Sequence, residues 1–205
     1  MKKLLLSTLL FSFVRFLESS YAAESFASLP KETQAKLLKG EVVPLSRRPG
    51  ESTPADRKYV TMAKLFKATR SEIWEVITDK EETEKFLDGV LESRQIERND
   101  KEIIFEQRTK VGGPKGSYLY TMKYLLTPEV KAEFVYVKGE INDISGGWYI
   151  LDGPNPDYKL VVYALFIDPG GFAPQAVVKF GMKKTIPSTL TSTEDEVKRR
   201  RAGAQ

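Results

Sequence analysis

The chain has 205 residues, with 32 basic (Lys or Arg) and 28 acidic (Asp or Glu) side chains and a net charge of +4 at neutral pH. It contains no histidine and no cysteine, which excludes a Ser-His-Asp triad, a thiol nucleophile, a histidine-type zinc centre and a disulfide. A metal site would need oxygen ligands alone, and because no EF-hand spacing is present we expect neither a metal nor a cofactor.

The first 22 residues have the order of a secretory signal peptide. Two lysines precede an uncharged apolar run over residues 4–14, and Ser20-Tyr21-Ala22 supplies small residues at the cleavage offsets. The apolar run is shorter than the roughly 20 residues that span a bilayer. We therefore expect residues 1–22 to be a signal peptide and the protein to be exported, to the periplasm or, without an outer membrane, to the medium. An uncleaved anchor is the alternative, because Arg15 and Glu18 lie late in the segment.

The charge balance of the remaining chain argues against nucleic acid as a partner. Residues 1–22 hold three basic groups and one acidic group, so their removal lowers the net charge from +4 to +2 over 183 residues. Nucleic-acid binding normally needs a dense basic face. We expect one domain over residues 41–200, preceded by a segment over 23–40, followed by a tail over 201–205, and monomeric in solution.

Short helices and strands alternate in the first part of that chain. Pro30 in the first turn and Gly40 beyond the end predict a helix over residues 30–39. Thr69 or Ser71 can cap a later helix. We expect strands at residues 41–46 and 58–68, and then a hairpin of two helices at residues 69–78 and 80–87.

A long β region follows, punctuated by turn residues, and predicts an antiparallel meander. Its expected strands cover residues 90–97, 102–111, 117–127, 130–138, 147–151 and 158–167. Apolar residues then recur every four positions from Val178 to Leu190, which predicts a terminal helix over residues 174–198. Pro187 lies inside that helix and should kink it or open its hydrogen bonds locally.

Alternation along the strands gives the sheet one aromatic, apolar face and one charged face. The strand over 158–167 is apolar on both faces, so we expect it to be covered on both sides. The aromatic face is rich in tyrosine, although a closed core would favour Phe, Leu and Val, because each buried phenol needs a partner. Tyrosine, methionine and glutamine suit a cavity that hydrogen-bonds a ligand. The alternative is that the tyrosines pack the sheet against the terminal helix, with their hydroxyls at the rim.

Three local patterns, in this order, resemble the START-like superfamily, which includes lipid-transfer START domains, coenzyme-Q-binding proteins, polyketide cyclases and birch-pollen-allergen-like proteins. They are the segment 71–79 with Trp74, the Gly146-Gly147-Trp148 tripeptide, and the turn over 168–174. The nearest resemblance is to bacterial exported START-type lipid-binding proteins. It implies an α+β helix-grip fold, in which a curved antiparallel sheet of about seven or eight strands wraps around a long C-terminal helix and encloses a tunnel.

On this resemblance we expect an exported, non-enzymatic protein that binds or transfers a hydrophobic ligand, such as a lipid, a sterol or hopanoid, or an isoprenoid-like molecule. Tyrosine and glutamine would supply hydrogen bonds to the ligand, and the other wall residues apolar area. The expected wall residues are Phe105, Gln107, Tyr120, Met122, Tyr124, Phe134, Tyr136, Trp148, Val178 and Met182. The basic run over 198–201 could make transient contact with a membrane surface, but we favour its role at the negative end of the helix dipole.

Two other functions are open at this point. A cyclase or hydrolase acting on an aromatic or lipid substrate would need acid–base residues, for which Glu92, Arg94 and Glu106 are candidates, although strand charges more often face solvent. An interaction module would instead have a filled interior. The glycine-rich segment 112–116 lacks the ending of a phosphate loop, and we expect a hairpin tip there that can act as a lid over the tunnel.

Overall fold

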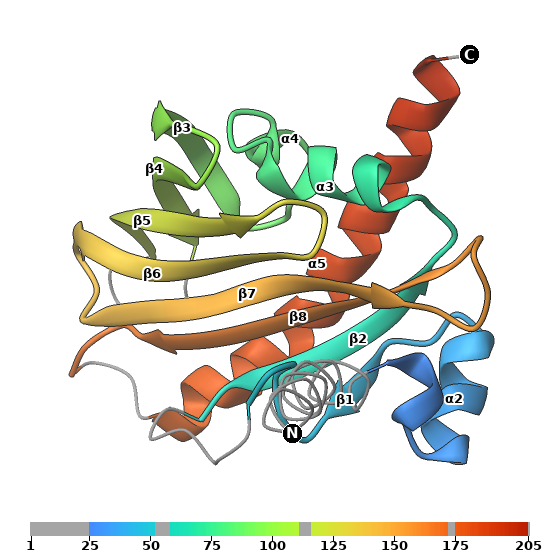
Figure 1. Cartoon of the computed structure of the whole chain (residues 1–205). Helices are drawn as coiled ribbons and strands as arrows, with labels where there is room; N and C mark the ends of the chain where they lie inside the picture. The colour runs from blue at the N-terminus through green and yellow to red at the C-terminus, as the bar shows by residue number, and fades with distance from the viewer. Residues whose placement is uncertain (1–24, 52–57, 111–115, 172–174, 205) are drawn as a thin grey trace, which may run out of the picture.

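The computed structural model describes residues 25–51, 58–110, 116–171 and 175–204. At its centre is an eight-stranded antiparallel sheet in the order β1-β2-β8-β7-β6-β5-β4-β3. The sheet curves around the long C-terminal helix α5, as Figure 1 shows. This confirms the predicted helix-grip α+β fold. The predicted signal peptide and all but the last residue of the glycine-rich segment lie outside the described residues.

The elements follow the predicted order. The strands are β1 (Val43–Leu45), β2 (Val60–Phe66), β3 (Val90–Arg98), β4 (Glu102–Lys110), β5 (Ser117–Thr127), β6 (Lys131–Gly139), β7 (Asp143–Asp152) and β8 (Lys159–Asp168). The helices are the short 3-10 turn η1 (Phe26–Ser28), α2 (Lys31–Leu38), α3 (Arg70–Thr78), α4 (Thr83–Phe86) and α5 (Gln175–Gly203). Within the described ranges, none of these helices combines the length and apolar character needed to cross a membrane.

Strand β7 begins at Asp143, four residues before its predicted start. Aspartate, serine and glycine favour strands weakly, so its first residues give no strand signal. Pairing with β8 extends the strand, with Asp143 opposite Asp168. Gly146 allows the close approach, because a Cβ there would lie 2.0 Å from the Ala164 carbonyl oxygen and 2.7 Å from the Phe134 ring.

The turn between α3 and α4 differs from the prediction, because α4 begins at Thr83 rather than at residue 80. Thr69 caps α3 in a reciprocal capping box with Glu72. At the other end, the Asp79 carbonyl oxygen accepts a hydrogen bond from Thr83 Oγ1 at 3.0 Å, and its carboxylate accepts the Glu82 N–H at 3.3 Å. Residues 80–82 therefore form a turn, and Lys80 is buried in it.

Helix α5 continues through Pro187 and ends five residues beyond its predicted end. Its C-terminal part is fixed to α3 by ion pairs: Arg201 contacts Glu72 at 2.7 Å, and Arg200 contacts Asp79 at 3.0 Å. The basic residues of this end thus have protein partners, in addition to the favourable helix dipole.

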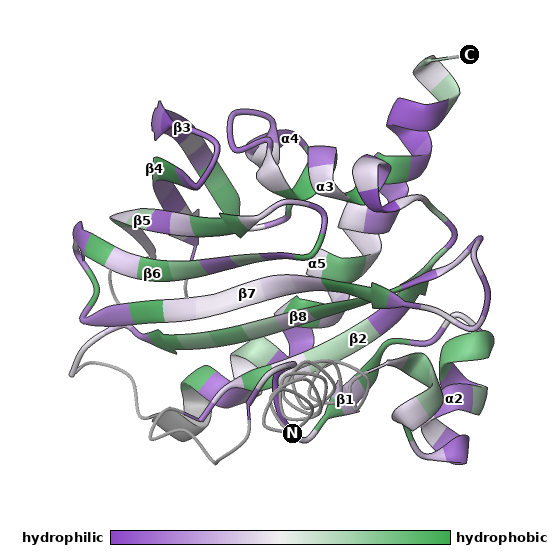
Figure 2. Ribbon diagram, in the orientation of Figure 1, coloured by the Kyte–Doolittle hydropathy of each residue, from purple (hydrophilic) through white to green (hydrophobic). Residues whose placement is uncertain are grey.

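Apolar residues form two clusters, one on each face of the sheet. The larger cluster lies between the inner face and helices α3 and α5. In the smaller one, Phe26 and Leu37 of the N-terminal segment pack with Leu160, Val162 and Ala164 of β8 on the outer face. Strand β8 is therefore covered on both sides, as predicted. Figure 2 shows β8 hydrophobic along most of its length, whereas the last turns of α5 are hydrophilic.

Candidate functional site

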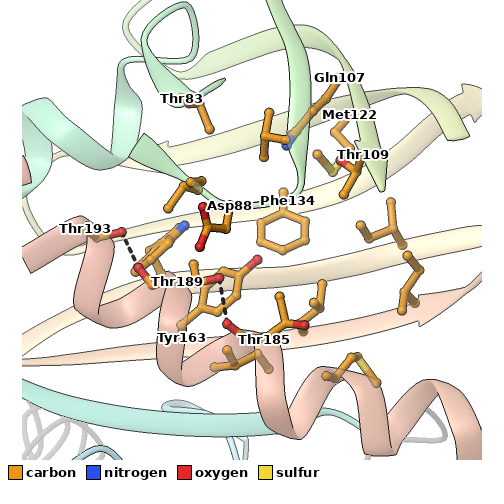
Figure 3. A pocket seen from close by; sticks show the side chains of 18 of the residues that line it. Thr83, Asp88, Gln107, Thr109, Met122, Phe134, Tyr163, Thr185, Thr189 and Thr193 are labelled. Atoms are coloured by element: carbon orange, nitrogen blue, oxygen red, sulfur yellow. Dashed lines mark hydrogen bonds between the residues drawn. The ribbon is translucent and has the colours of Figure 1, made fainter. Parts of the chain in front are cut away.

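A cavity of about 380 Å³ lies between the inner face of the sheet and helix α5. Its wall comes from strands β3 to β8, from helices α3 and α4 with the turn between them, and from one side of α5 (Figure 3). The volume falls within the range of about 300–1,000 Å³ that is typical of small-molecule sites. The interior is therefore not completely filled by side chains.

Eight of the ten residues predicted for the wall lie on this cavity. They alternate along β4 and β5, continue across β6 and β7, and return on α5, so one hollow brings together residues from five elements. They are Gln107, Tyr120, Met122, Tyr124, Phe134, Trp148, Val178 and Met182. The geometry is that of a site; their contact with a ligand stays a prediction.

The other two predicted residues, Phe105 and Tyr136, do not line the cavity. Phe105 is fully buried behind the wall and packs edge-to-face on Tyr124, with the ring centroids 5.0 Å apart. Tyr136 lies beside a register shift between β5 and β6, and its hydroxyl donates to the Gly139 carbonyl oxygen at 3.0 Å. Simple alternation identified the correct face of each strand but not how far each side chain lies from the hollow.

The phenols of the wall are neutral hydrogen-bonding groups. The Tyr120 hydroxyl donates to Thr109 Oγ1 at 2.8 Å. Burial raises the pKa of Tyr120 to about 12, with the bond to Thr109 acting in the opposite direction. Burial likewise raises the pKa of Tyr124, against a hydrogen bond with Trp148, and that of Tyr163 well above its usual value. Groups with such raised pKa values do not ionise near neutral pH, so they can orient a ligand but are weak acids.

A row of threonines on α5, which the sequence analysis missed, faces the same cavity. Thr185, Thr189 and Thr193 lie four residues apart and line the wall, and Figure 3 shows them along one side of the helix. Each hydroxyl donates to the carbonyl oxygen four residues earlier, at 2.8–3.1 Å. They recur every four residues, like the apolar residues from Val178 to Leu190, but one position earlier along the helix. The sequence therefore contained this repeat, which was missed because threonine was not counted as an apolar residue.

Lys80 is the other important omission. It lines the cavity and is only 5% exposed. Its Nζ lies 4.3 Å from the centroid of the Tyr124 ring. The pKa of Lys80 is lowered to about 7, chiefly by burial; the charge of Asp79 acts in the opposite direction, and the positive charge of Arg98 adds to the lowering. No sequence pattern indicated this burial, because lysine in a turn between helices is normally solvated.

Four of the described residues that line the cavity are exposed to solvent. Asp88 and Lys110 lie near the end of β4, and Gly181 and Thr185 lie on α5. Residues 111–115, which join β4 and β5, were predicted to form a lid; they lie outside the described residues. The open side of the cavity is therefore polar, whereas its interior is mainly apolar.

The acid–base candidates from the sequence do not meet in the cavity. Arg94 pairs with Glu106 at 3.2 Å and Arg108 with Glu92 at 3.4 Å, across β3 and β4. None of these four residues lines the hollow. In the part of the chain that the structure describes, no group of three or more acidic side chains lies close enough to hold a metal ion.

The family model described as "Polyketide cyclase / dehydrase and lipid transport" matches residues 66–194. The chain belongs to this family. It is thereby a member of the START-like superfamily, as the local sequence patterns predicted. No curated protein matches the chain in sequence. The match includes every strand from β3 to β8, the two helices α3 and α4, and most of α5.

Solved structures similar to this START-like chain include both kinds of protein in the family description. A STAR-related lipid transfer protein from Xanthomonas axonopodis is 15% identical with a TM-score of 0.61, over 77% of this chain and 98% of that one. Human StAR-related lipid transfer protein 5 is 14% identical with a TM-score of 0.59, over 78% and 81%. The Zhui aromatase/cyclase from a Streptomyces species is 14% identical with a TM-score of 0.60, over 70% and 94%. At these identities the similarity shows the fold alone, and it does not distinguish a carrier from a cyclase.

Proposed function

We propose that this START-like protein is an exported carrier, which binds one hydrophobic molecule in the cavity and releases it unchanged. The observation that carries the proposal is the cavity itself. Its wall is mainly apolar, and its hydroxyl groups are largely bonded within the protein, as at Tyr120 and Thr189. Each CH₂ group taken out of water gains about 0.8 kcal/mol, so a chain of a dozen carbons gains roughly ten.

The chemistry of the wall supports a carrier over an enzyme. General acid–base catalysis needs groups whose pKa values lie near the working pH and that converge on one point. The wall phenols have raised pKa values, and Asp88 lies exposed at the open side of the cavity. One buried lysine, Lys80, and a set of neutral phenols can bind and orient a ligand, and they form no acid–base pair.

The proposed location outside the cytoplasm rests on the N-terminal order of basic, apolar and small residues. We expect the protein recovered from the cell envelope or the medium to lack residues 1–22. Intact-mass measurement of the natural product tests this directly. A full-length mass in the envelope fraction would instead favour the uncleaved anchor.

Native mass spectrometry of the freshly purified mature protein tests the carrier function, followed by solvent extraction and identification of the bound molecule. We expect one lipid-like adduct per chain, and uptake of lipid by the delipidated protein. Thr189→Trp should fill the cavity and abolish uptake, because Thr189 lines it. Thr191→Trp is the matched control, since Thr191 is exposed on the same helix. Absence of both adduct and uptake in the unmodified protein would contradict the proposal.

One observation favours a cyclase as a second candidate. Lys80, whose pKa is lowered to about 7 by burial, would be a base near neutral pH in contact with a bound substrate. An enzyme would return the extracted ligand chemically altered. Turnover that is lost in Lys80→Met while binding is retained would establish this function in place of the carrier.

A further inference from the structure

Lys80 occupies an unusual place for a lysine. It follows Asp79, the C-terminal cap of α3, and its side chain runs into the cavity wall rather than to solvent. The ammonium lies over two aromatic rings, 4.3 Å from the centroid of Tyr124 and 5.4 Å from that of Phe105. Cation–π contacts of this kind recover only part of the lost hydration. Lys85, on the neighbouring short helix, is by contrast exposed.

The protein supplies no hydrogen-bonded partner for this ammonium. Among the described residues, none forms a hydrogen bond or an ion pair with Lys80 Nζ. The adjacent acid, Asp79, is engaged elsewhere, since its carboxylate contacts Arg200 at 3.0 Å and accepts the Glu82 N–H. The nearby Arg98 adds positive charge, and it donates to the Thr78 carbonyl oxygen at 3.0 Å.

An unpaired ammonium in an apolar wall is unfavourable unless an anion joins it. A lysine stem is long and flexible enough to reach solvent where it is free to do so. The side chain of Gln107 is also buried on this wall, and its amide can donate a hydrogen bond to an anion. On the other side, α5 offers mainly apolar groups and the methyl groups of its threonines. The cavity thus combines one buried positive charge with a hydrophobic interior.

We propose that Lys80 binds the acidic head group of the carried molecule, which is therefore a long-chain carboxylic acid or a closely similar acidic amphiphile. One ammonium balances the single charge of a carboxylate, whereas a phosphate monoester carries about −1.5 to −2 at neutral pH and calls for further cations. The apolar tail would fill the space along α5. This inference rests on the proposed carrier function and narrows its ligand.

Binding of three ligands to the delipidated protein tests whether the site prefers an acidic head group. The ligands are hexadecanoic acid, hexadecanol and hexadecylamine, which have the same sixteen-carbon chain and differ in the head group. Tryptophan fluorescence reports binding, measured in a Trp74→Phe background that leaves Trp148 on the cavity wall as the one tryptophan of the chain; native mass spectrometry counts the bound molecules. We expect the acid to bind about tenfold or more tightly than the alcohol, which is the gain from a charge-assisted hydrogen bond. The amine should bind most weakly, because like charges would meet. Acetate should not compete, because the head group alone buries no chain.

Three variants test whether Lys80 is the residue that gives the preference for the acid over the alcohol. Lys80→Met keeps the length and apolar character of the side chain, and it should bind the acid no more tightly than the alcohol, because the carboxylate then lacks a counter-charge. Lys80→Arg keeps the charge and should keep the preference for the acid. Lys85→Met removes a lysine charge from the adjacent, exposed site, and it should behave as the unmodified protein does.

The outcomes separate the two proposals. Equal affinity for acid and alcohol in the unmodified protein, or an acid preference that survives in Lys80→Met, would overturn the role of Lys80 and leave the carrier standing. Binding of none of the three ligands would overturn the carrier and this inference together. Competition by acetate at the same concentrations would show that the site binds small anions, and it would overturn the proposal of a long-chain acid. If Lys80→Met fails to fold, Lys110→Met removes the other lysine that lines the cavity among the described residues: it should keep the acid preference, and loss of that preference in the folded variant would overturn the role of Lys80.

Discussion

At the scale of single residues, Lys80 links binding to stability. Its folded-state pKa of about 7 lies below the ordinary value of 10.5, chiefly because burial disfavours the charged form. Below pH 7 the ligand-free protein holds a buried ammonium that it would hydrate better when unfolded. Groups that lower stability in this way are enriched at functional sites.

The sign of the pH dependence follows from the same pKa. Between pH 7 and 10.5 the unfolded chain binds the lysine proton and the folded chain has lost it, so the free energy of unfolding rises with pH. From pH 6 to pH 9 we expect a rise of about 2–3 kcal/mol from this group. In Lys80→Met that rise should be absent, and the variant should be the more stable protein at pH 6. Urea unfolding of ligand-free protein measures both, with Lys85→Met as the control that keeps the rise.

Glu72 gives a pH dependence of the same sign in a lower pH window, because its pKa is also lowered in the folded protein, but here the folded protein stabilises the charged form. The Arg201 guanidinium lowers the pKa of Glu72 to about 2, so its contribution is complete above pH 4.5 and is lost as the pH falls through 2. The side chain is 31% exposed, and after allowance for screening we expect Glu72→Gln to lose about 1 kcal/mol at pH 7. Glutamine can preserve the capping box with Thr69. The substitution therefore removes the charge of Glu72 without removing the helix cap.

A second carboxylate provides the comparison for Glu72. Glu32 contacts Lys36 at 2.7 Å, the same distance, but on the surface of α2. Glu32→Gln should leave urea unfolding at pH 7 unchanged, because exposed pairs contribute little. The difference between Glu72→Gln and the unmodified protein should vanish as the pH approaches 2. A difference that is independent of pH would show that the charge of Glu72 does not hold α5 against α3.

At the scale of elements, the sequence predicted the order of helices and strands, because hydrophobic period and turn residues are local signals. It missed the first residues of β7, where pairing with β8 overrides the weak strand preference of Asp143 and Ser145. It also placed α4 too early, since the bonds around Asp79 hold residues 80–82 in a turn. The burial of Lys80 could not be predicted, because it depends on how the turn meets Tyr124 across the fold.

Gly146 shows how closely β7 packs. An added Cβ would lie 2.0 Å from the Ala164 carbonyl oxygen, which is backbone and cannot move aside alone. We expect Gly146→Ala to destabilise the protein by about 3 kcal/mol, through overpacking in the middle of the sheet. Gly181→Ala is the control, because a Cβ at this helical position meets open space and should stabilise by about 0.5–1 kcal/mol. Thermal unfolding of both variants measures the contrast, and equal midpoints would contradict the assigned contact.

At the scale of the whole molecule, the two faces of the sheet are covered by different elements: helix α5 on the inner face and the N-terminal segment on the outer face. The inner face meets α5 across the cavity of about 380 Å³, whereas the outer face packs against the N-terminal segment, beside a second pocket of about 350 Å³ that Leu29, Leu45 and Leu160 help to line. Tyr149 lies in the outer cluster, and its hydroxyl donates to Glu133 at 3.0 Å. A buried contact of the outer cluster should therefore contribute to the stability of the fold without changing ligand occupancy of the inner cavity.

Leu37 tests this division of roles. It is 1% exposed and packs α2 onto the outer face of the sheet, so Leu37→Ala should lose about 2–4 kcal/mol of unfolding free energy through the cavity it leaves. Ligand affinity at temperatures where the variant stays folded should not change, because Leu37 does not line the inner cavity. Leu38→Ala is the control, since Leu38 is 63% exposed on the same helix. Urea unfolding and lipid uptake, measured on the same samples, check both halves. A weakened uptake in the folded Leu37 variant would mean that the two faces of the sheet are coupled.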